Sequence, residues 1–400
     1  MSATTTAGPT AVRRQGAEAD AVTGVVPGTV VRPPDVEAVR ALLREAAGEH
    51  ATVVPVGSGS KTGWAAPPSS CDVRLDLTGL DALVEHTAGD LVVVAQAGMR
   101  LDALQARLGE AGQQLGLDPP EAGATLGGVL SANASGPRRL RYGTVRDLLI
   151  GVTVVLPDAT VAASGGKVVK NVAGYDLGKL YTGAHGSLGV VVSTTWRLHP
   201  LAPASGVVVV PVRDAADAGR CAQLLVRSTL TPSAVELLAP AGGEPSLVVL
   251  FESIPESVQA QAEATVALLG AGTVVEDLPA GFGRRPGDAD QLVLRLAYEP
   301  FALPAALDAL PDTASVTASA GTGVAYVALP AEQGAAALPG LRAALAAYDG
   351  TAVVLSAPPA VRDGLDHWGP VGDTLDLMRR LKDRFDPERR LSPGRFVGGL

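Results

Sequence analysis

The chain has 400 residues, of which 47% are hydrophobic and 18% charged, and its formal net charge is −9. This length accommodates two or three domains, and the hydrophobic fraction excludes an intrinsically disordered protein. The acidic balance lacks the basic footprint of nucleic-acid-binding proteins, so we expect no nucleic-acid partner.

No targeting or membrane signal is visible in the sequence. The first 24 residues contain no apolar stretch of the kind found in signal peptides, and no apolar run approaches the roughly 18 residues of a membrane span. The two cysteines, Cys71 and Cys221, show neither metal-binding nor redox spacing. We therefore expect a cytoplasmic protein without a transmembrane segment.

Apolar periodicity predicts the elements of the N-terminal half. Residues 1–24 are small and polar and predict a flexible tail. The elements predicted after it are a helix capped by Asp35, strands at 53–56, 72–77 and 91–97, a helix between Leu101 and Gly112, and a hairpin of strands at 148–156 and 160–163. Residues 118–147 are too rich in Gly, Pro, Ser and Asn for one ordinary element, which is typical of a functional segment.

The pattern changes near residue 201. Residues 207–274 and 292–355 each predict the order strand, helix, strand, strand, helix, strand, which is typical of ferredoxin-like units. We expect the two units to share one sheet. The last 40 residues predict one helix around 374–385 and an irregular tail.

Four glycine-rich segments lie within about 135 residues, at 57–63, 124–136, 165–177 and 183–191. Glycines permit positive φ, so successive backbone N–H groups can converge on an oxyanion, and Ser58 and Ser60 add hydroxyl donors. Each segment alone could be a surface turn, and neither the Walker A motif nor the three-glycine dinucleotide fingerprint is present. Together they predict a chain wrapped around an extended dinucleotide with a flat ring.

Two stretches of the sequence resemble a known family: the last two glycine-rich segments together, and a segment near the C-terminus. Residues 165–191 (GGKVVKNVAGYDLGKLYTGAHGSLGVV) and 377–395 (LMRRLKDRFDPERRLSPGR) resemble the FAD-binding subunits of glycolate oxidases, within the vanillyl-alcohol-oxidase-type flavoproteins. The resemblance implies an α+β fold: a two-subdomain FAD-binding domain at 25–203 and a ferredoxin-like α+β cap domain at 204–356. A C-terminal return segment at 357–400 would pack on the FAD-binding domain.

The resemblance also implies a set of FAD-binding residues, carried over position by position. Those expected at the pyrophosphate are Pro55, Gly57, Ser58, Gly59, Ser60 and Lys61. Those expected along the pyrophosphate and ribityl chain are Pro119, Ala124, Thr125, Gly127 and Gly128. Those expected near the isoalloxazine are Ser131, Asn133, Ser135 and Gly136. Gly189 and Val190 are expected to offer backbone contacts to the cofactor. The histidine or cysteine that attaches flavin covalently in some relatives is absent, so we expect non-covalent FAD.

The catalytic groups are harder to identify. Oxidation of an alcohol by a flavin needs a base for the hydroxyl proton, and a carboxylate substrate favours an arginine clamp. Arg138, Arg139 and Arg141 are clamp candidates, but a basic surface patch or partner-docking site is favoured. Tyr142 and Tyr175 are either flavin neighbours or core rings. The sequence identifies no base.

Metal ligands are not expected either. The five histidines show no ligand spacing, and the G-H-x-G-D-G-N segment of metal-dependent relatives is absent. His185 and His199 are interpreted as structural, and His367 as a packing residue.

The family resemblance implies an FAD-dependent subunit of a glycolate or 2-hydroxy acid oxidase. A larger flavoprotein subunit and an iron–sulfur subunit are the expected partners, through which the chain could associate peripherally with a membrane. Two alternatives remain open: a flavin-binding relay or assembly subunit without its own substrate site, and a standalone sugar or alditol oxidase. The missing metal segment favours the relay subunit over a self-sufficient enzyme. It also predicts that the isolated chain reduces its flavin slowly or not at all.

Overall fold

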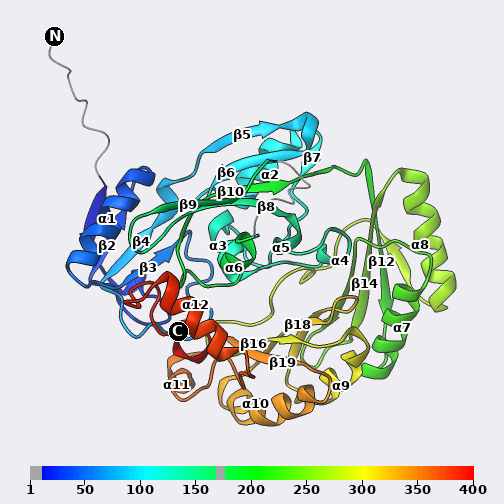
Figure 1. The fold of residues 1–400 in the computed structure, drawn as a ribbon. Helices are drawn as coiled ribbons and strands as arrows, with labels where there is room; N and C mark the ends of the chain where they lie inside the picture. Colours follow the sequence, from blue (N-terminus) through cyan, green and yellow to red (C-terminus); the bar gives the residue numbers. More distant parts are fainter. Residues whose placement is uncertain (1–10, 168–175) are drawn as a thin grey trace.

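Two sheets and the helices packed on them form the N-terminal half of the molecule (Figure 1). The computed structural model describes residues 11–167 and 176–400. The first sheet has the strand order β1 (Val12–Gln15), β2 (Thr29–Arg32), β4 (Val73–Asp76) and β3 (Val53–Val56). Helix α1 (Val36–Gly48) is the predicted helix, and the Asp35 carboxylate accepts a hydrogen bond from the Ala38 N–H at 2.8 Å.

The N-terminal strand differs from the sequence-based expectation. Residues 1–24 were predicted to be a flexible tail, but β1 pairs antiparallel with β2 through four residue pairs. The Asp20 side chain is buried and pairs with Arg14 and Arg74. β1 is an edge strand with charged side chains, so apolar periodicity gives no signal for it. The prediction of a flexible tail is therefore wrong for the described part of residues 1–24.

The second sheet is antiparallel. Its strand order is β5 (Leu83–Thr87), β6 (Val92–Gln96), β10 (Val190–Arg197), β8 (Leu149–Val155) and β9 (Val161–Gly165). The helices of this region are α2 (Leu101–Gly109), α3 (Leu126–Ala132), α4 (Arg139–Tyr142), α5 (Val145–Leu148) and α6 (Gly178–Tyr181). The irregular segment predicted at 118–147 thus contains three short helices. A small sheet joins β7 (Gln113–Gln114) to β11 (His199–Pro200).

An eight-stranded antiparallel sheet forms the cap. Its strand order is β15 (Thr273–Val275), β12 (Ala204–Pro211), β14 (Ser246–Ser253), β13 (Ala234–Ala239), β17 (Ser315–Ser319), β18 (Val324–Pro330), β16 (Gln291–Ala297) and β19 (Thr351–Ser356). Its helices are α7 (Ala215–Arg227), α8 (Pro255–Leu269), α9 (Leu303–Asp308) and α10 (Ala331–Ala346). Along the chain, these strands and helices follow the predicted order of two successive βαββαβ units. The two units meet in the sheet where β13 pairs with β17. The helices cover the outer face, so the inner face points toward the N-terminal half (Figure 1).

The C-terminal segment returns to the first sheet. It contains α11 (Pro359–Arg362) and α12 (Leu375–Phe385), and Leu391 lies parallel to Val53 of β3. The buried ammonium of Lys382 donates to the Asp386 carboxylate at 2.7 Å and to the carbonyls of Ser187 and Leu391 at 2.8 and 2.9 Å. Because every N–H of this cation can be satisfied, the buried charge is compensated and fixes α12 on the first half.

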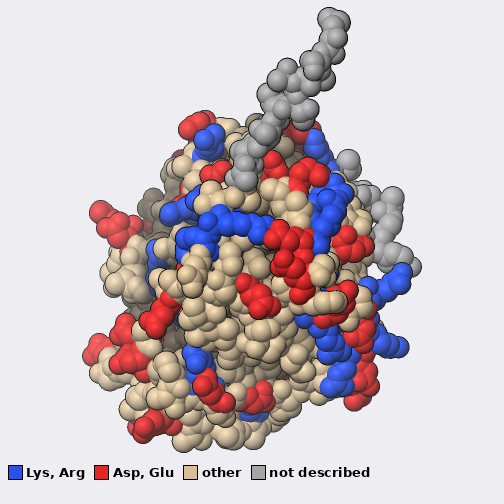
Figure 2. Space-filling view, turned by 90° about the vertical axis from the view of Figure 1, so that its left-hand side faces the viewer, with Lys and Arg blue, Asp and Glu red and all other residues tan. Residues whose placement is uncertain are grey.

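Short 3₁₀ helices complete the element inventory. They are η1 (Glu18–Asp20), η2 (Leu77–Gly79), η3 (Ala88–Asp90), η4 (Pro300–Ala302) and η5 (Val397–Gly399). Within the described ranges, no helix is long and apolar enough to cross a membrane. Acidic and basic side chains are interspersed on the face shown in Figure 2, which carries no broad patch of one sign.

Candidate functional site

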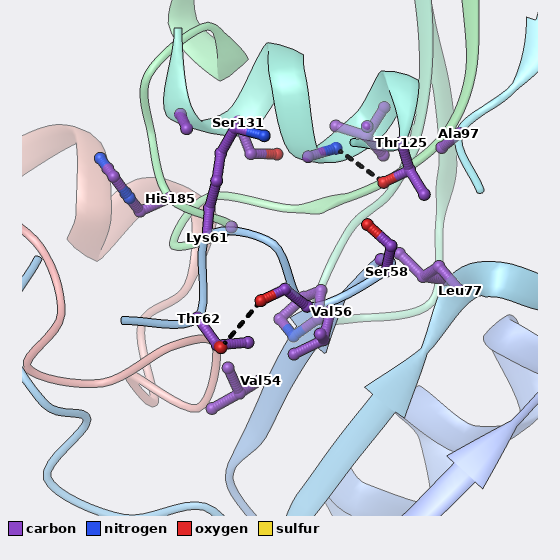
Figure 3. Close-up of a pocket in the computed structure, with 18 of the residues that line it drawn as sticks. Val54, Val56, Ser58, Lys61, Thr62, Leu77, Ala97, Thr125, Ser131 and His185 are labelled. Carbon is purple, nitrogen blue, oxygen red and sulfur yellow. Dashed lines mark hydrogen bonds between the residues drawn. The ribbon is translucent and has the colours of Figure 1, made fainter. Parts of the chain in front are cut away.

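The first cavity is a cleft between the first and second sheets, with about 750 Å³ of free space, open solvent included. Its walls include the loop after β3, α3 and the segment before β10 (Figure 3). The predicted cofactor residues that line it are Pro55, Gly57, Ser58, Gly59, Ser60, Lys61, Thr125, Gly127, Gly128, Ser131 and Gly189. The structure therefore brings together residues that three separate glycine-rich segments contribute.

The loop after β3 needs its glycines for two different reasons. Gly59 has φ +82°, which L side chains rarely adopt, and the Thr62 hydroxyl donates to its carbonyl at 3.0 Å. A Cβ at Gly57 would lie 2.0 Å from the Thr125 hydroxyl oxygen, so a larger residue would block the approach of the loop to α3. Thr125 in turn caps α3 by accepting from the Gly128 N–H at 3.3 Å. Backbone therefore faces the cavity on both sides, which suits a pyrophosphate.

Lys61 supplies a cation to this cavity. Its side chain is only 8% exposed, and Figure 3 shows it extending from the loop toward Ser131. Its ammonium lies 3.6 Å from a carboxylate oxygen of Glu121 and donates to the Ser60 hydroxyl at 3.2 Å. Burial lowers the pKa of Lys61 and raises the pKa of Glu121. A pyrophosphate beside Lys61 would favour its charged form.

Sequence reasoning missed two residues of the cavity wall that come from distant parts of the chain. Arg395 is buried, donates to the Trp64 carbonyl at 2.6 Å and to the Thr23 hydroxyl at 3.1 Å, and has a pKa lowered by burial to about 10. His185 packs edge-on to Trp368 at 5.3 Å, and burial lowers its pKa to about 3, so it is neutral. Both residues stood in motifs that the sequence had singled out, but no local signal places them in this wall.

The other predicted cofactor residues occupy different places. Ala124 and Val190 are buried beside the cavity, Asn133 ends α3 in the left-handed conformation, and Pro119 lies in the preceding loop; none of these four lines the first cavity. Ser135 and Gly136 line a second, narrow cavity between this loop and the cap sheet, with free space for little more than one water molecule.

The two cavities are neighbours. The segment from Ser131 to Gly136 contributes to both, and Ala134 in its middle packs with Trp64 and Tyr326. Tyr326 belongs to β18 and also lines the second cavity. A ligand with its phosphates at the β3 loop and its ring along this segment would therefore end at the cap sheet.

The three arginines after the second glycine segment do not form the predicted surface patch. Arg138 donates to the Glu252 carboxylate at 2.7 and 3.1 Å, and Arg141 donates to the Glu252 carbonyl at 2.6 Å. Arg139 is only 9% exposed and lines the second cavity. The three side chains do not form one solvated patch, because Arg139 is buried and Arg138 and Arg141 bond to Glu252 of the cap. A docking role for the exposed Arg141 stays a prediction.

The remaining candidates are structural or lie outside the described residues. The Tyr142 hydroxyl accepts from Gln114 at 3.4 Å, and its ring contacts His199 at 4.8 Å. His367 is buried and its Nδ1 lies 3.1 Å from the Leu365 carbonyl. Tyr175 lies outside the described residues. Over residues 11–167 and 176–400, no group of three or more His, Cys, Asp or Glu side chains is arranged to hold a metal ion.

Comparisons with known proteins agree with this geometry. The FAD binding domain family matches residues 27–165, and the family of the C-terminal domain of FAD linked oxidases matches residues 366–396. The chain is 34% identical over 165 residues to glycolate oxidase subunit GlcE of Escherichia coli, covering 41% of this chain and 47% of that protein. It is 32% identical over 251 residues to a D-lactate dehydrogenase of Archaeoglobus fulgidus, covering 58% and 55%.

Solved structures show the same fold. p-Cresol methylhydroxylase superimposes with a TM-score of 0.73 at 16% identity, covering 93% of this chain and 89% of that one. Alkyldihydroxyacetonephosphate synthase gives 0.68 at 16% identity, with 93% and 77% covered. The predicted α+β fold of the vanillyl-alcohol-oxidase type and the predicted FAD cofactor are thereby confirmed. The chain spans about half the length of the two curated relatives.

Proposed function

We propose that this chain is an FAD-linked oxidoreductase and the FAD-binding subunit of a complex that oxidises glycolate or a related 2-hydroxy acid. The observation that carries the proposal is the first cavity, which presents glycine backbone, hydroxyl groups and two cations beside apolar side chains such as Val56 and Leu77. Lys61 and Arg395 are those cations, and both are buried.

The residues of the cavity have separate tasks in this proposal. The backbone of 57–61 and the ammonium of Lys61 bind the pyrophosphate, and Gly127 and Gly128 let the ribityl chain approach α3. The segment from Ser131 to Gly136 orients the ring at the cap sheet, which excludes water from the reacting face. Bound FAD supplies a two-electron acceptor for the hydride of the substrate. Attachment is non-covalent in this proposal.

The names of the relatives support the substrate class and the complex. One relative is named as a glycolate oxidase subunit, and another as a D-lactate dehydrogenase. We propose a larger flavoprotein subunit and an iron–sulfur subunit as partners, a cytoplasmic location, and membrane association through those partners only.

The test starts with the purified chain alone and with the complex obtained by co-expressing neighbouring genes. We expect a flavin spectrum whose yellow colour passes entirely into the supernatant after acid precipitation. Anaerobic glycolate or D-lactate should bleach the flavin of the complex. A chain that never carries flavin, or a flavin that no 2-hydroxy acid reduces in the complex, would contradict the proposal.

The two alternatives give different results in the same experiment. A relay or assembly subunit would hold FAD but show no 2-hydroxy acid binding of its own. A standalone sugar or alditol oxidase would turn over an alditol without any partner.

A further inference from the structure

A loop of the cap reaches the N-terminal half of the molecule. Residues 276–290, the cap loop, form the irregular connection from β15 to β16. Phe282 anchors this loop on the face of the cap sheet opposite the outer helices, where it packs against the cluster that contains Val248. Arg284 follows in the loop and donates to the Pro120 carbonyl at 3.5 Å. The cap loop therefore lies against the segment that leads into α3.

The cap loop contributes to a group of three charged side chains beside the first cavity. Arg285 belongs to the cap loop, Glu121 to the segment before α3, and Lys61 to the β3 loop. The Lys61 ammonium lies 3.6 Å from one carboxylate oxygen of Glu121, and the Arg285 Nε lies 3.9 Å from the other. The side chains of Lys61 and Glu121 are 8% exposed, and that of Arg285 is 26% exposed. A cation of the cavity and a cation of the cap thus share one carboxylate.

Neither of the two contacts is a closed ion pair. The carboxylate oxygens of Glu121 accept no hydrogen bond from the described residues, and the buried Nη1 of Arg285 donates none to them. Charge-assisted hydrogen bonds are normally about 2.7–2.9 Å long. Glu121 is therefore held between two cations instead of being bonded to one of them. Since an unpaired buried charge is costly, a Glu121 carboxylate that lost Arg285 should move onto Lys61.

Lys61 keeps most of its N–H groups unused in this arrangement. An ammonium can donate three hydrogen bonds, and among the described residues Lys61 donates one, to the Ser60 hydroxyl at 3.2 Å. The side chain extends through the first cavity toward Ser131 (Figure 3). Burial lowers the pKa of Lys61, and the charge of Glu121 opposes this shift. Glu121 therefore favours the charged form of Lys61 without occupying its N–H groups.

We propose that Arg285 is a positioning residue for the FAD site: by sharing Glu121, it keeps the Lys61 ammonium available to the pyrophosphate. The inference rests on the proposed placement of the pyrophosphate beside Lys61. With the cap loop seated, Arg285 holds one side of the carboxylate. With the cap loop displaced, Glu121 bonds to Lys61 and competes with the pyrophosphate. The position of the cap loop thus sets the affinity for FAD, and by linkage bound FAD favours the seated loop.

The test measures the FAD affinity of the full chain after its flavin has been removed, by calorimetry and by quenching of flavin fluorescence. Arg285→Met should weaken FAD binding roughly fivefold, because Glu121 then pairs with Lys61. Arg285→Lys keeps the charge and should bind FAD more tightly than Arg285→Met. The matched control is Arg227→Met, which removes an exposed arginine of α7 that forms no ion pair among the described residues. FAD affinity should be unchanged in this control.

The decisive variant combines Glu121→Gln with Arg285→Met. Glutamine lacks the charge that would capture Lys61, so the double variant should bind FAD about threefold or more tightly than Arg285→Met alone. If Arg285 served only to hold the cap loop in place, removal of Glu121 would give no such rescue. A double variant that binds FAD no better than Arg285→Met overturns the proposal. Wild-type affinity in Arg285→Met overturns it as well.

The wild-type chain gives an independent measurement. Residue 286 is proline, so Arg284 is the position of the cap loop after which trypsin can cleave. Bound FAD should slow this cleavage roughly threefold or more, because proteolysis follows the population of the displaced loop. Equal cleavage with and without FAD would contradict the coupling.

Lys61→Met separates this inference from the proposed function. It should weaken FAD binding roughly tenfold or more, and Arg285→Met should then have no further effect. If Lys61→Met weakens binding but Arg285→Met does not, only the role of Arg285 is overturned. A chain that binds no FAD, or a Lys61→Met variant with wild-type affinity, contradicts the proposed cofactor site itself.

Discussion

The two neighbouring cavities are built in opposite ways. The first is lined mainly by backbone and small side chains from segments that are each continuous in the sequence. The second is lined by charged and aromatic side chains, such as Arg139, Glu236 and Tyr326, that come from strands and a helix far apart in the chain. In the proposed function, the first cavity binds the cofactor through glycine conformation, whereas the second cavity depends on the docking of the cap onto α4.

This difference separates two kinds of failure. Damage to the first cavity should remove the flavin while the fold survives. Damage around the second should weaken the contact between the cap and the N-terminal half while the flavin remains. The following predictions test that separation, beginning with the largest expected effect.

Gly59→Asp should abolish FAD retention. Position 59 has φ +82°, and a carboxylate there would repel the pyrophosphate, so we expect FAD affinity to fall roughly 100-fold or more while circular dichroism is preserved. Gly242→Asp is the matched control, because Gly242 also has positive φ (+67°) with no atom near its added Cβ. Equal flavin content in the two variants would show that the β3 loop is only a turn.

Arg138→Gln should destabilise the contact between the cap and the N-terminal half. The change leaves Glu252, whose side chain is 8% exposed, without its three charged hydrogen bonds from Arg138. We expect the free energy of unfolding to fall by about 2 to 3 kcal/mol in urea titrations, with FAD affinity little changed. Arg146→Gln on exposed α5 should change it by less than about 0.5 kcal/mol. A loss of flavin as severe as in Gly59→Asp would show that the two regions are not separable.

Asp118 should make stability depend on pH. Burial raises its pKa to about 7, and one of its carboxylate oxygens lacks a hydrogen-bond partner among the described residues. In the unfolded chain the group ionises near pH 4. Between about pH 4 and 7 the unfolded state therefore releases a proton that the folded state holds, and the free energy of unfolding falls as pH rises.

Asp118→Asn should remove this part of the pH dependence. Because residue 118 is partly accessible, we expect the free energy of unfolding of the variant to exceed that of wild type by about 1 to 2 kcal/mol at pH 7. At pH 4 the two proteins should be equally stable. Thermal melts of both proteins at several pH values provide the measurement. An equal difference between the two proteins at every pH would contradict the assignment.

Thr125→Val should have the smallest effect. It removes the hydroxyl that caps α3 at the Gly128 N–H, so the free energy of unfolding should fall by about 1 kcal/mol. Thr125→Ser keeps the hydroxyl and should be closer to wild type. FAD content should decrease only slightly in both, since the backbone of the β3 loop is intact. A valine variant as stable as the serine variant would indicate that the cap contributes nothing.

The sequence predicted the elements better than it predicted what they bring together. Helix α1 was expected from Asp35 and its apolar stripe, and the cap order from two successive runs of strands and helices, because these signals are local. The β3 loop was also predicted, because glycines alternating with hydroxyl residues, as at Gly57 and Gly59, are a local signal for a loop that uses positive φ or close backbone approach. Arg395 was missed because its role depends on a contact with Trp64, which lies 331 residues away.

Glu236, which lines the second cavity, was missed for a related reason. It is a single charge inside an apolar strand, and the alternation of the strand shows that it faces away from the outer helices. That signal was present in the sequence. What could not be predicted is that α4 would place Arg139 over the same face, because this needs the relative position of the two halves of the molecule.

The return of the C-terminal segment to β3 has a consequence for biosynthesis. Domains generally fold from the N-terminus while the chain is still being made. Here the edge of β3 receives Arg390 and Ser392, and the first cavity receives Arg395, only after the whole cap has been translated. For most of its synthesis, a nascent chain therefore has an incomplete first cavity and an unpaired edge of β3. Flavin retention should report that the last segment has docked, so limited availability of FAD would expose this edge to aggregation and proteolysis in cells.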